Sequence, residues 1–166
     1  RRHGHIGRIQ TAAPMRVKGT AVFLTRDPKL VPHSLLLNLK HNKVLHERIV
    51  FLGMFTDAKA YVPDGDRVHV ETVSPNVFRV NAHYGFAEDP AVPAVVERCR
   101  RMGLDINLEE TTFFVGRETL LATDRPGMAI WRERLFSRLA RNARRATRFF
   151  KIPPNRVVEL GAEIEL

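Results

Sequence analysis

A cluster of cations and imidazoles occupies the segment LKHNKVLHER, residues 39–48. Its basic side chains are Lys40, His41, Lys43, His46 and Arg48. The two histidines are five residues apart, whereas side chains meet on a helix at spacings of three or four, so a helix would not direct both imidazoles to one metal ion. The cations could instead hold an anionic ligand or contact another domain. A solvated shoulder where a helix meets a strand explains the same composition, and residue types alone leave both interpretations open.

Arg117 is a further candidate for the same kind of contact. It follows Gly116 in the β-rich run of residues 111–122, TTFFVGRETLLA. Neighbouring side chains of a strand point to opposite faces, so Arg117 would not pair with Glu118 and is available to a phosphate, a carboxylate or a carbonyl elsewhere. The simpler interpretation is structural, with Gly116 serving a bulge or a positive φ.

The strongest charge pattern lies in residues 127–151, which we predict to form the longest helix, ended by Pro153 and Pro154. Arginines spaced by 4, 3, 4 and 3 residues form a basic stripe, which consists of Arg134, Arg138, Arg141, Arg145 and Arg148. Apolar residues form the opposite face. A core helix usually interleaves acids with its arginines, and here only Glu133 does so. We therefore predict that the stripe faces anionic lipid headgroups, where each cation contributes about 1 kcal/mol.

Composition limits the function classes. The chain has 166 residues, a net charge of +9 and one cysteine, and no apolar run approaches the length of a membrane span. It does not begin with Met, which suggests a piece of something longer. A basic chain could bind nucleic acid, but Trp131, Phe149 and Phe150 are expected on the apolar side of the basic helix, and GxxG, RNP-like or zinc-finger patterns are absent, which argues against this partner. No phosphate loop, GxSxG or paired carboxylates occur, so we predict no catalytic residues, no metal site and no cofactor.

Periodicity predicts an α/β (α+β) domain with a mixed sheet of about six strands and three main helices. The expected strands are residues 19–25, 48–56, 67–73, 77–86, 111–122 and 156–166. The first helix follows Ser34 as N-cap, ends at Asn42, and presents Leu35, Leu36 and Leu39 on one face. The second spans residues 89–103, from Asp89 as its cap to Gly103. The first two strands, connected by the first helix, should pair in parallel. Strands 67–73 and 77–86 should form a hairpin. Residues 1–16 should form a linker or disordered arm.

Several separate motifs resemble one family in its own order. They are NLKHNKVLHER, HYGF, FFVGRETL and RNARRATRFFKIPPNRVVELGAEIEL. Together they resemble the cytoplasmic C-terminal domain of the KUP (KUP/HAK/KT) family of potassium uptake transporters, over about residues 17–166. The family pattern reads RYGF where this chain has His83, so any role of a cation at that position becomes pH-dependent or is lost.

The resemblance implies a parent protein with about a dozen membrane helices that couples potassium uptake to proton entry. This segment would then be a soluble domain at the cytoplasmic face of the membrane, without an ion pathway, that serves regulation, coupling or dimerisation. Its partners would be the transmembrane part of the same transporter, with an anionic lipid surface, a second copy or a cyclic dinucleotide as further ones. A stand-alone sensor of an anionic nucleotide beside Lys40, Lys43 and Arg117 is the alternative, and a nucleic-acid-binding domain is the second alternative.

Overall fold

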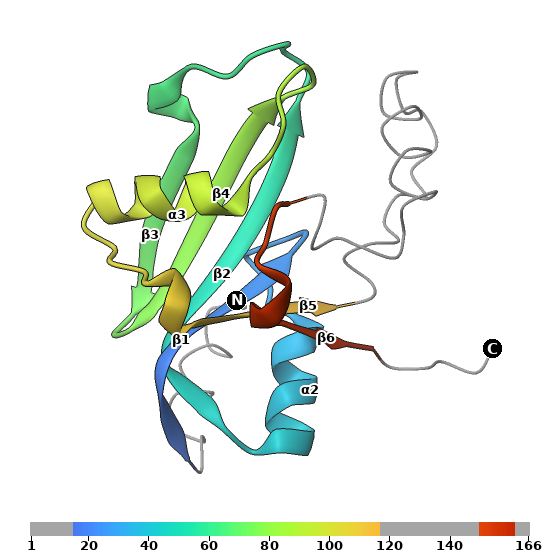
Figure 1. Cartoon of the computed structure of the whole chain (residues 1–166), viewed down its shortest axis with the longest axis vertical. Coiled ribbons are helices and arrows are strands. Elements are labelled where there is room, and N and C mark those ends of the chain that lie inside the picture. Colours follow the sequence, from blue (N-terminus) through green and yellow to red (C-terminus); the bar gives the residue numbers. More distant parts are fainter. Residues whose placement is uncertain (1–14, 117–149, 162–166) are drawn as a thin grey trace, which may run out of the picture.

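The computed structural model describes residues 15–116 and 150–161, which form one six-stranded sheet with the strand order β3-β4-β2-β1-β5-β6 (Figure 1). The strands are β1 (Arg16–Thr25), β2 (Leu45–Asp57), β3 (Val68–Ser74), β4 (Val77–Gly85), β5 (Thr111–Gly116) and β6 (Val157–Leu160). All neighbouring strands are parallel except β3 and β4. The predicted mixed sheet, the parallel pairing of the first two strands and the 67–86 hairpin are therefore confirmed.

The described residues contain two α-helices, α2 (His33–Asn42) and α3 (Val92–Arg101), and not the three main helices that we predicted. The expected helix 127–151 falls almost entirely outside the described residues. Its last two positions, Phe150 and Lys151, form a turn, in which Lys151 has a left-handed φ of 54°. A helix cannot continue through that conformation, so the predicted end point was wrong by at least two residues.

The predicted N-caps of both helices were wrong, whereas α2 ends at Asn42 as predicted. Pro32, with an extended backbone, is the N-cap of α2, and Ser34 lies buried inside the first turn. Asn42 remains helical because its side-chain amide donates to Asn38 Oδ1 at 2.8 Å, and the left-handed position falls on Lys43 instead. Asp89 does not cap α3. The N-cap is Ala91, whose neighbour Val92 donates its N–H to the carbonyl of Phe150 at 2.9 Å.

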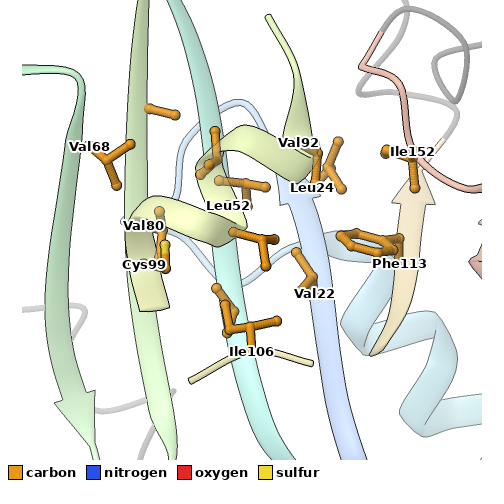
Figure 2. Close-up of a cluster of buried hydrophobic side chains, with 14 of the residues drawn as sticks. Val22, Leu24, Leu52, Val68, Val80, Val92, Cys99, Ile106, Phe113 and Ile152 are labelled. Carbon is orange, nitrogen blue, oxygen red and sulfur yellow. The ribbon is translucent and has the colours of Figure 1, made fainter. Parts of the chain in front are cut away.

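The two helices cover opposite faces of the sheet and bury two separate clusters of apolar side chains. Under α3, Val92, Val95 and Cys99 pack against alternate residues of the central strands, such as Leu52 and Val80 (Figure 2). Under α2, Leu35 packs against another set, which includes Phe23, Phe51 and Phe114.

The predicted apolar face of α2 was partly wrong. Leu35 and Leu39 face the sheet, but Leu36 is 48% exposed. Positions 35 and 39 are one turn apart and share a face, whereas position 36 is rotated by about 100° from position 35. The apolar stripe of this helix is therefore narrower than the sequence indicates.

Candidate functional site

The sheet creates a switch point beside its central strand β1. The parallel strands β4, β2, β1, β5 and β6 all end at the same edge. From β1 the chain runs through α2 to β2 on one side, while β5 and β6 lie on the other side. In doubly wound sheets the connections diverge at such a point and leave a crevice outside the carboxyl ends of the strands, where ligands bind.

A cavity of about 500 Å³ lies at this point. Its lining includes Thr25 and Asp27 after β1, Gly116 at the end of β5, Leu160 at the end of β6, and Ser34 and Leu37 of α2. We call it the switch-point cavity. Leu24, Leu30 and Val31 add apolar wall, and the volume is in the range of small-molecule sites.

The first turn of α2 presents its polar groups to this cavity. Among the described residues, no side chain caps the N-terminus of this helix. Ser34 is only 4% exposed and lines the cavity. A helix N-terminus carries about half a positive charge, so this end of α2 makes one side of the cavity weakly electropositive.

The basic segment 39–48 does not form one site. Lys40, His41 and Lys43 lie exposed at the C-terminal end of α2, where cations interact favourably with the helix dipole. Strand β2 begins at Leu45, three residues earlier than predicted, so His46 and Arg48 belong to the strand. Arg48 donates to the carbonyl of Asp105, in the loop that follows α3. The basic residues of this segment are therefore divided between the end of a helix and the start of a strand.

His46 is the partly buried member of this segment. Its ring meets the Phe114 ring edge-on with 5.9 Å between the centroids, and its Nδ1 is buried without a partner among the described residues. Burial without a compensating hydrogen bond disfavours the imidazolium, which lowers the pKa of His46 below the ordinary 6.5.

We therefore expect His46 to make the fold acid-sensitive. Because the pKa of His46 is lower in the folded state, the unfolded chain binds more protons as the pH falls below about 6.5, and stability is lost in that direction. When the pH is lowered from about 7.5 to 5, the free energy of unfolding measured in urea should fall less for His46→Phe than for the parent chain. His41→Phe, at an exposed position, should keep the parent's loss. An equal loss in all three proteins would contradict this role of His46.

At the same edge of the sheet, His83 of the HYGF motif forms a second polar centre. His83 Nδ1 lies 2.9 Å from Asp57 Oδ1 at the end of β2, and its ring stacks on Phe55 at 5.1 Å. The edge of the His83 ring also faces His69, 6.0 Å away. Five residues after His83, Glu88 accepts hydrogen bonds from Arg67 and from the backbone.

The other predicted site residues cannot be placed. Arg117 and the stripe Arg134, Arg138, Arg141, Arg145 and Arg148 lie outside the described residues. Gly116, next to Arg117, pairs in register with Leu160 and has no positive φ. Within residues 15–116 and 150–161, no three histidine, cysteine or acidic side chains gather as a metal-binding group. Among the described helices, none has the length and apolar character needed to span a bilayer.

A comparison with known families matches residues 18–166 to the K+ potassium transporter C-terminal domain. The chain belongs to this KUP C-terminal domain family. It is 53% identical over 161 residues to the probable potassium transport system protein Kup of Myxococcus xanthus, with 97% of this chain and 25% of that protein covered. A Kup 2 of Chromobacterium violaceum is 49% identical over 161 residues, which are 97% of this chain and 26% of that protein. No solved structure matches the chain.

This KUP C-terminal domain thus spans about a quarter of the length of the curated relatives that it matches. The sequence did not predict its switch-point cavity, because Ser34 was interpreted as an N-cap and the anionic contact was predicted at Lys40 and Lys43, at the other end of α2. The signal that could have found the cavity was the predicted parallel strand–helix–strand unit, whose first loop must lie at the carboxyl edge of the sheet.

Proposed function

We propose that this chain is the non-enzymatic cytoplasmic domain of a potassium:proton symporter, and that it regulates the transport core or couples to it. The observation that carries this proposal is the match of almost the whole chain to about a quarter of relatives named as potassium transport proteins. An ion pathway needs segments that span the membrane, and on this proposal those segments belong to the rest of the parent protein.

The described surface supports action by contact. Lys40, His41 and Lys43 lie exposed at one end of α2 and offer cations to an acidic loop of the transport core or to anionic lipid. The arginine stripe of residues 134–148 would add to the same attraction. A second copy of the domain is a further partner in this proposal, since most soluble oligomers are formed by symmetric copies of one chain.

The proposal is tested in the full-length parent with and without residues 17–166. Both forms are expressed in cells that lack other potassium uptake systems, and their membrane levels are matched. We expect the truncated form to differ in potassium uptake, in its response to external pH, or in oligomeric state measured in detergent. If uptake, regulation and assembly are all unchanged, the domain has no such role.

An anionic-ligand sensor is the second candidate function. The observation that favours it is the switch-point cavity, which lies beside the N-terminus of α2, where no described side chain forms a cap. Sensing is compatible with a regulatory role in a transporter, because a ligand that binds one conformation of the domain better than another shifts the equilibrium between them.

A further inference from the structure

We propose that the loops after β2 and β4 form a docking surface for a Lys/Arg-rich loop of the transport core, the part of the parent protein that spans the membrane. We call this surface the aromatic edge. It consists of residues 58–66 and 85–91, which carry the exposed rings of Tyr61 and Phe86. Both loops lie at the carboxyl edge of the sheet, at the top of the view in Figure 1. This inference rests on the proposed role of the domain and assigns the surface through which the domain acts.

Two aromatic side chains are exposed on these neighbouring loops. Tyr61 is 69% exposed and Phe86 is 49% exposed, whereas the other phenylalanine and tyrosine side chains among the described residues are buried or partly buried. A single exposed apolar residue is normal on a protein surface. Tyrosine and phenylalanine are, however, enriched where proteins meet, and tyrosine is frequent among the residues that dominate binding energy. Two exposed rings on adjoining loops therefore indicate a contact surface.

The backbones of the two loops are held together without a partner. Phe86 donates its N–H to the carbonyl of Lys59 at 2.9 Å. Ala87 donates its N–H to the carbonyl of Ala60 at 3.1 Å. A Cβ atom at Gly85 would lie 2.1 Å from the carbonyl oxygen of Ala60, so only glycine permits this close approach. The backbone of the surface is thus preformed, which limits the conformational entropy that is lost when a partner binds.

The charges beside the rings favour a basic partner. The aromatic edge contains four acidic residues and one basic residue, so its formal charge is −3, whereas the whole chain carries +9. The basic residue is Lys59, and the acidic residues are Asp64, Asp66, Glu88 and Asp89. A partner rich in lysine and arginine is complementary to this surface in charge, and such complementarity speeds association and excludes wrong partners.

Two of the cations that pair with these acids lie deeper than the carboxylates. Arg67 and Arg98 both pair with Asp64, but their side chains are 14% and 26% exposed, whereas the Asp64 side chain is 81% exposed. Lys151 Nζ reaches Asp89 only at 3.9 Å, and the Asp89 side chain is 91% exposed. A partner that approaches the aromatic edge therefore meets carboxylates and rings first. A guanidinium group suits both, because it pairs with carboxylates and stacks on aromatic faces.

The same charges argue against two other occupants. The carboxylates would be repelled by anionic lipid headgroups. A second copy that docked through the same surface on a twofold axis would bring acids against acids, because both copies present the same residues. Cytoplasmic loops of membrane proteins, by contrast, carry an excess of lysine and arginine near the ends of their membrane helices. A loop of the transport core is therefore the basic partner that the proposed role brings close to the domain.

The test introduces the photoreactive residue benzoylphenylalanine in place of Tyr61 in the full-length parent, in its membrane. Ultraviolet light links this residue to the groups that it touches, and mass spectrometry identifies the linked peptide. We expect links to a Lys/Arg-rich cytoplasmic loop of the transport core. The control replaces Met102, which is 54% exposed and follows α3, and should not give this product. Links from position 61 to lipid, to a second copy or to residues 134–148 of the same chain overturn the assignment, and so does the absence of any link to the transport core.

A pair of charge reversals tests the choice of partner. Asp89→Lys should lower the yield of the position-61 product at least about threefold, because a like charge then faces the basic loop. Asp105→Lys is the matched control, since the Asp105 side chain is 81% exposed and lies in the loop that follows α3. It should leave the yield unchanged. Equal yields in the parent, Asp89→Lys and Asp105→Lys would show that charge does not select the partner, and the inference would be wrong.

Potassium uptake separates this inference from the proposed role. Tyr61→Ala combined with Asp89→Lys should reproduce at least part of the change that deletion of residues 17–166 causes. Met102→Ala combined with Asp105→Lys should transport as the parent does. If the deletion alters uptake but the first double variant does not, and no loop of the transport core is linked, the role stands and the aromatic edge is not its surface. If the loop is linked and the deletion changes nothing, the contact exists and the proposed role fails.

Discussion

Replacing Glu88 by alanine is expected to lower the free energy of unfolding by about 3 kcal/mol, the cost of removing one partner from a largely buried ion pair. Arg67 Nη2 donates to Glu88 Oε1 at 2.5 Å, and the two side chains are 14% and 15% exposed. The other carboxylate oxygen, Oε2, accepts the N–H groups of Gly85 at 2.7 Å and Val62 at 3.0 Å. Alanine would leave one guanidinium and two amides without their acceptor, and thermal or urea unfolding measures the loss.

The same contacts predict how stability depends on pH. Hydrogen bonding to Arg67, aided by the two amides, lowers the pKa of Glu88 from 4.5 to about 2. The unfolded chain therefore takes up a proton first, and the contribution of Glu88, which is complete above about pH 4.5, is lost as the pH falls toward 2. Glu88→Gln should be less stable than the parent near neutral pH and should approach it in acid.

Glu97→Gln is the control for this prediction. Glu97 forms surface ion pairs with Arg100 and Arg101, so this substitution should change stability by less than about 0.5 kcal/mol. A stability difference between Glu88→Gln and the parent that stays constant from neutral pH to pH 2 would show that the carboxylate charge plays no part. The contacts of Glu88 with Arg67 and with the backbone matter for the site because they fix where β2 and β4 end. Phe86 and Ala87 donate their N–H groups to the carbonyls of Lys59 and Ala60 beside it.

The elements that could be predicted from the sequence are those encoded by local pattern. The apolar runs around Val22 and Val50 can be buried only inside a sheet with both faces covered, and helices do cover both faces. The alternation from Val68 to Glu71 likewise indicates a half-exposed strand, and His69 and Glu71 are indeed exposed.

Helix ends were less predictable, because several residues near each end can serve as a cap and packing decides among them. Ser34 has the side chain of an N-cap, yet Pro32 is the N-cap, and Ser34 lies buried in the first turn of α2, where it lines the cavity. Lys43 takes the left-handed position that Asn42 is better suited for. Asn42 is already bonded to Asn38, which in turn donates to the carbonyl of Val44.

Contacts between distant segments could not be predicted at all from spacing. Arg67 and Glu88 are 21 residues apart, and nothing in either segment identifies the partner. The switch-point cavity joins residues near positions 25, 34, 116 and 160, which meet only because β5 and β6 lie on one side of β1 and β2 on the other. The segment 39–48, by contrast, is continuous in sequence but is divided between a helix end and a strand.

The second large effect is expected at Arg79, a residue of β4 that is 7% exposed and therefore the most deeply buried cation among the described residues. Its Nε donates to the carbonyl of Pro28 at 2.8 Å, and its Nη1 pairs with Glu71 Oε2 at 2.5 Å. Pro28 lies in the loop between β1 and α2 and also approaches Gly53, where a Cβ atom would lie 3.0 Å from the proline ring. Arg79 and Gly53 thus hold the loop that forms one side of the switch-point cavity.

Arg79→Ala should lower the free energy of unfolding by about 2–4 kcal/mol, because it leaves a cavity and an unpaired buried carbonyl. Arg79→Met keeps most of the side-chain volume and should lose less, and the difference between the two variants measures the packing part. Glu71→Gln should cost about 1 kcal/mol or less, since Glu71 is 60% exposed. Urea unfolding ranks the three variants. Hydrogen exchange of the Leu30 amide, which donates to the Asp27 carbonyl at 3.1 Å, measures how often the loop opens.

If Arg79→Ala unfolds like the parent and leaves that exchange rate unchanged, the loop is held by other contacts and Arg79 is not its anchor. If the variants rank as expected, a charge buried in the sheet sets the position of the cavity wall.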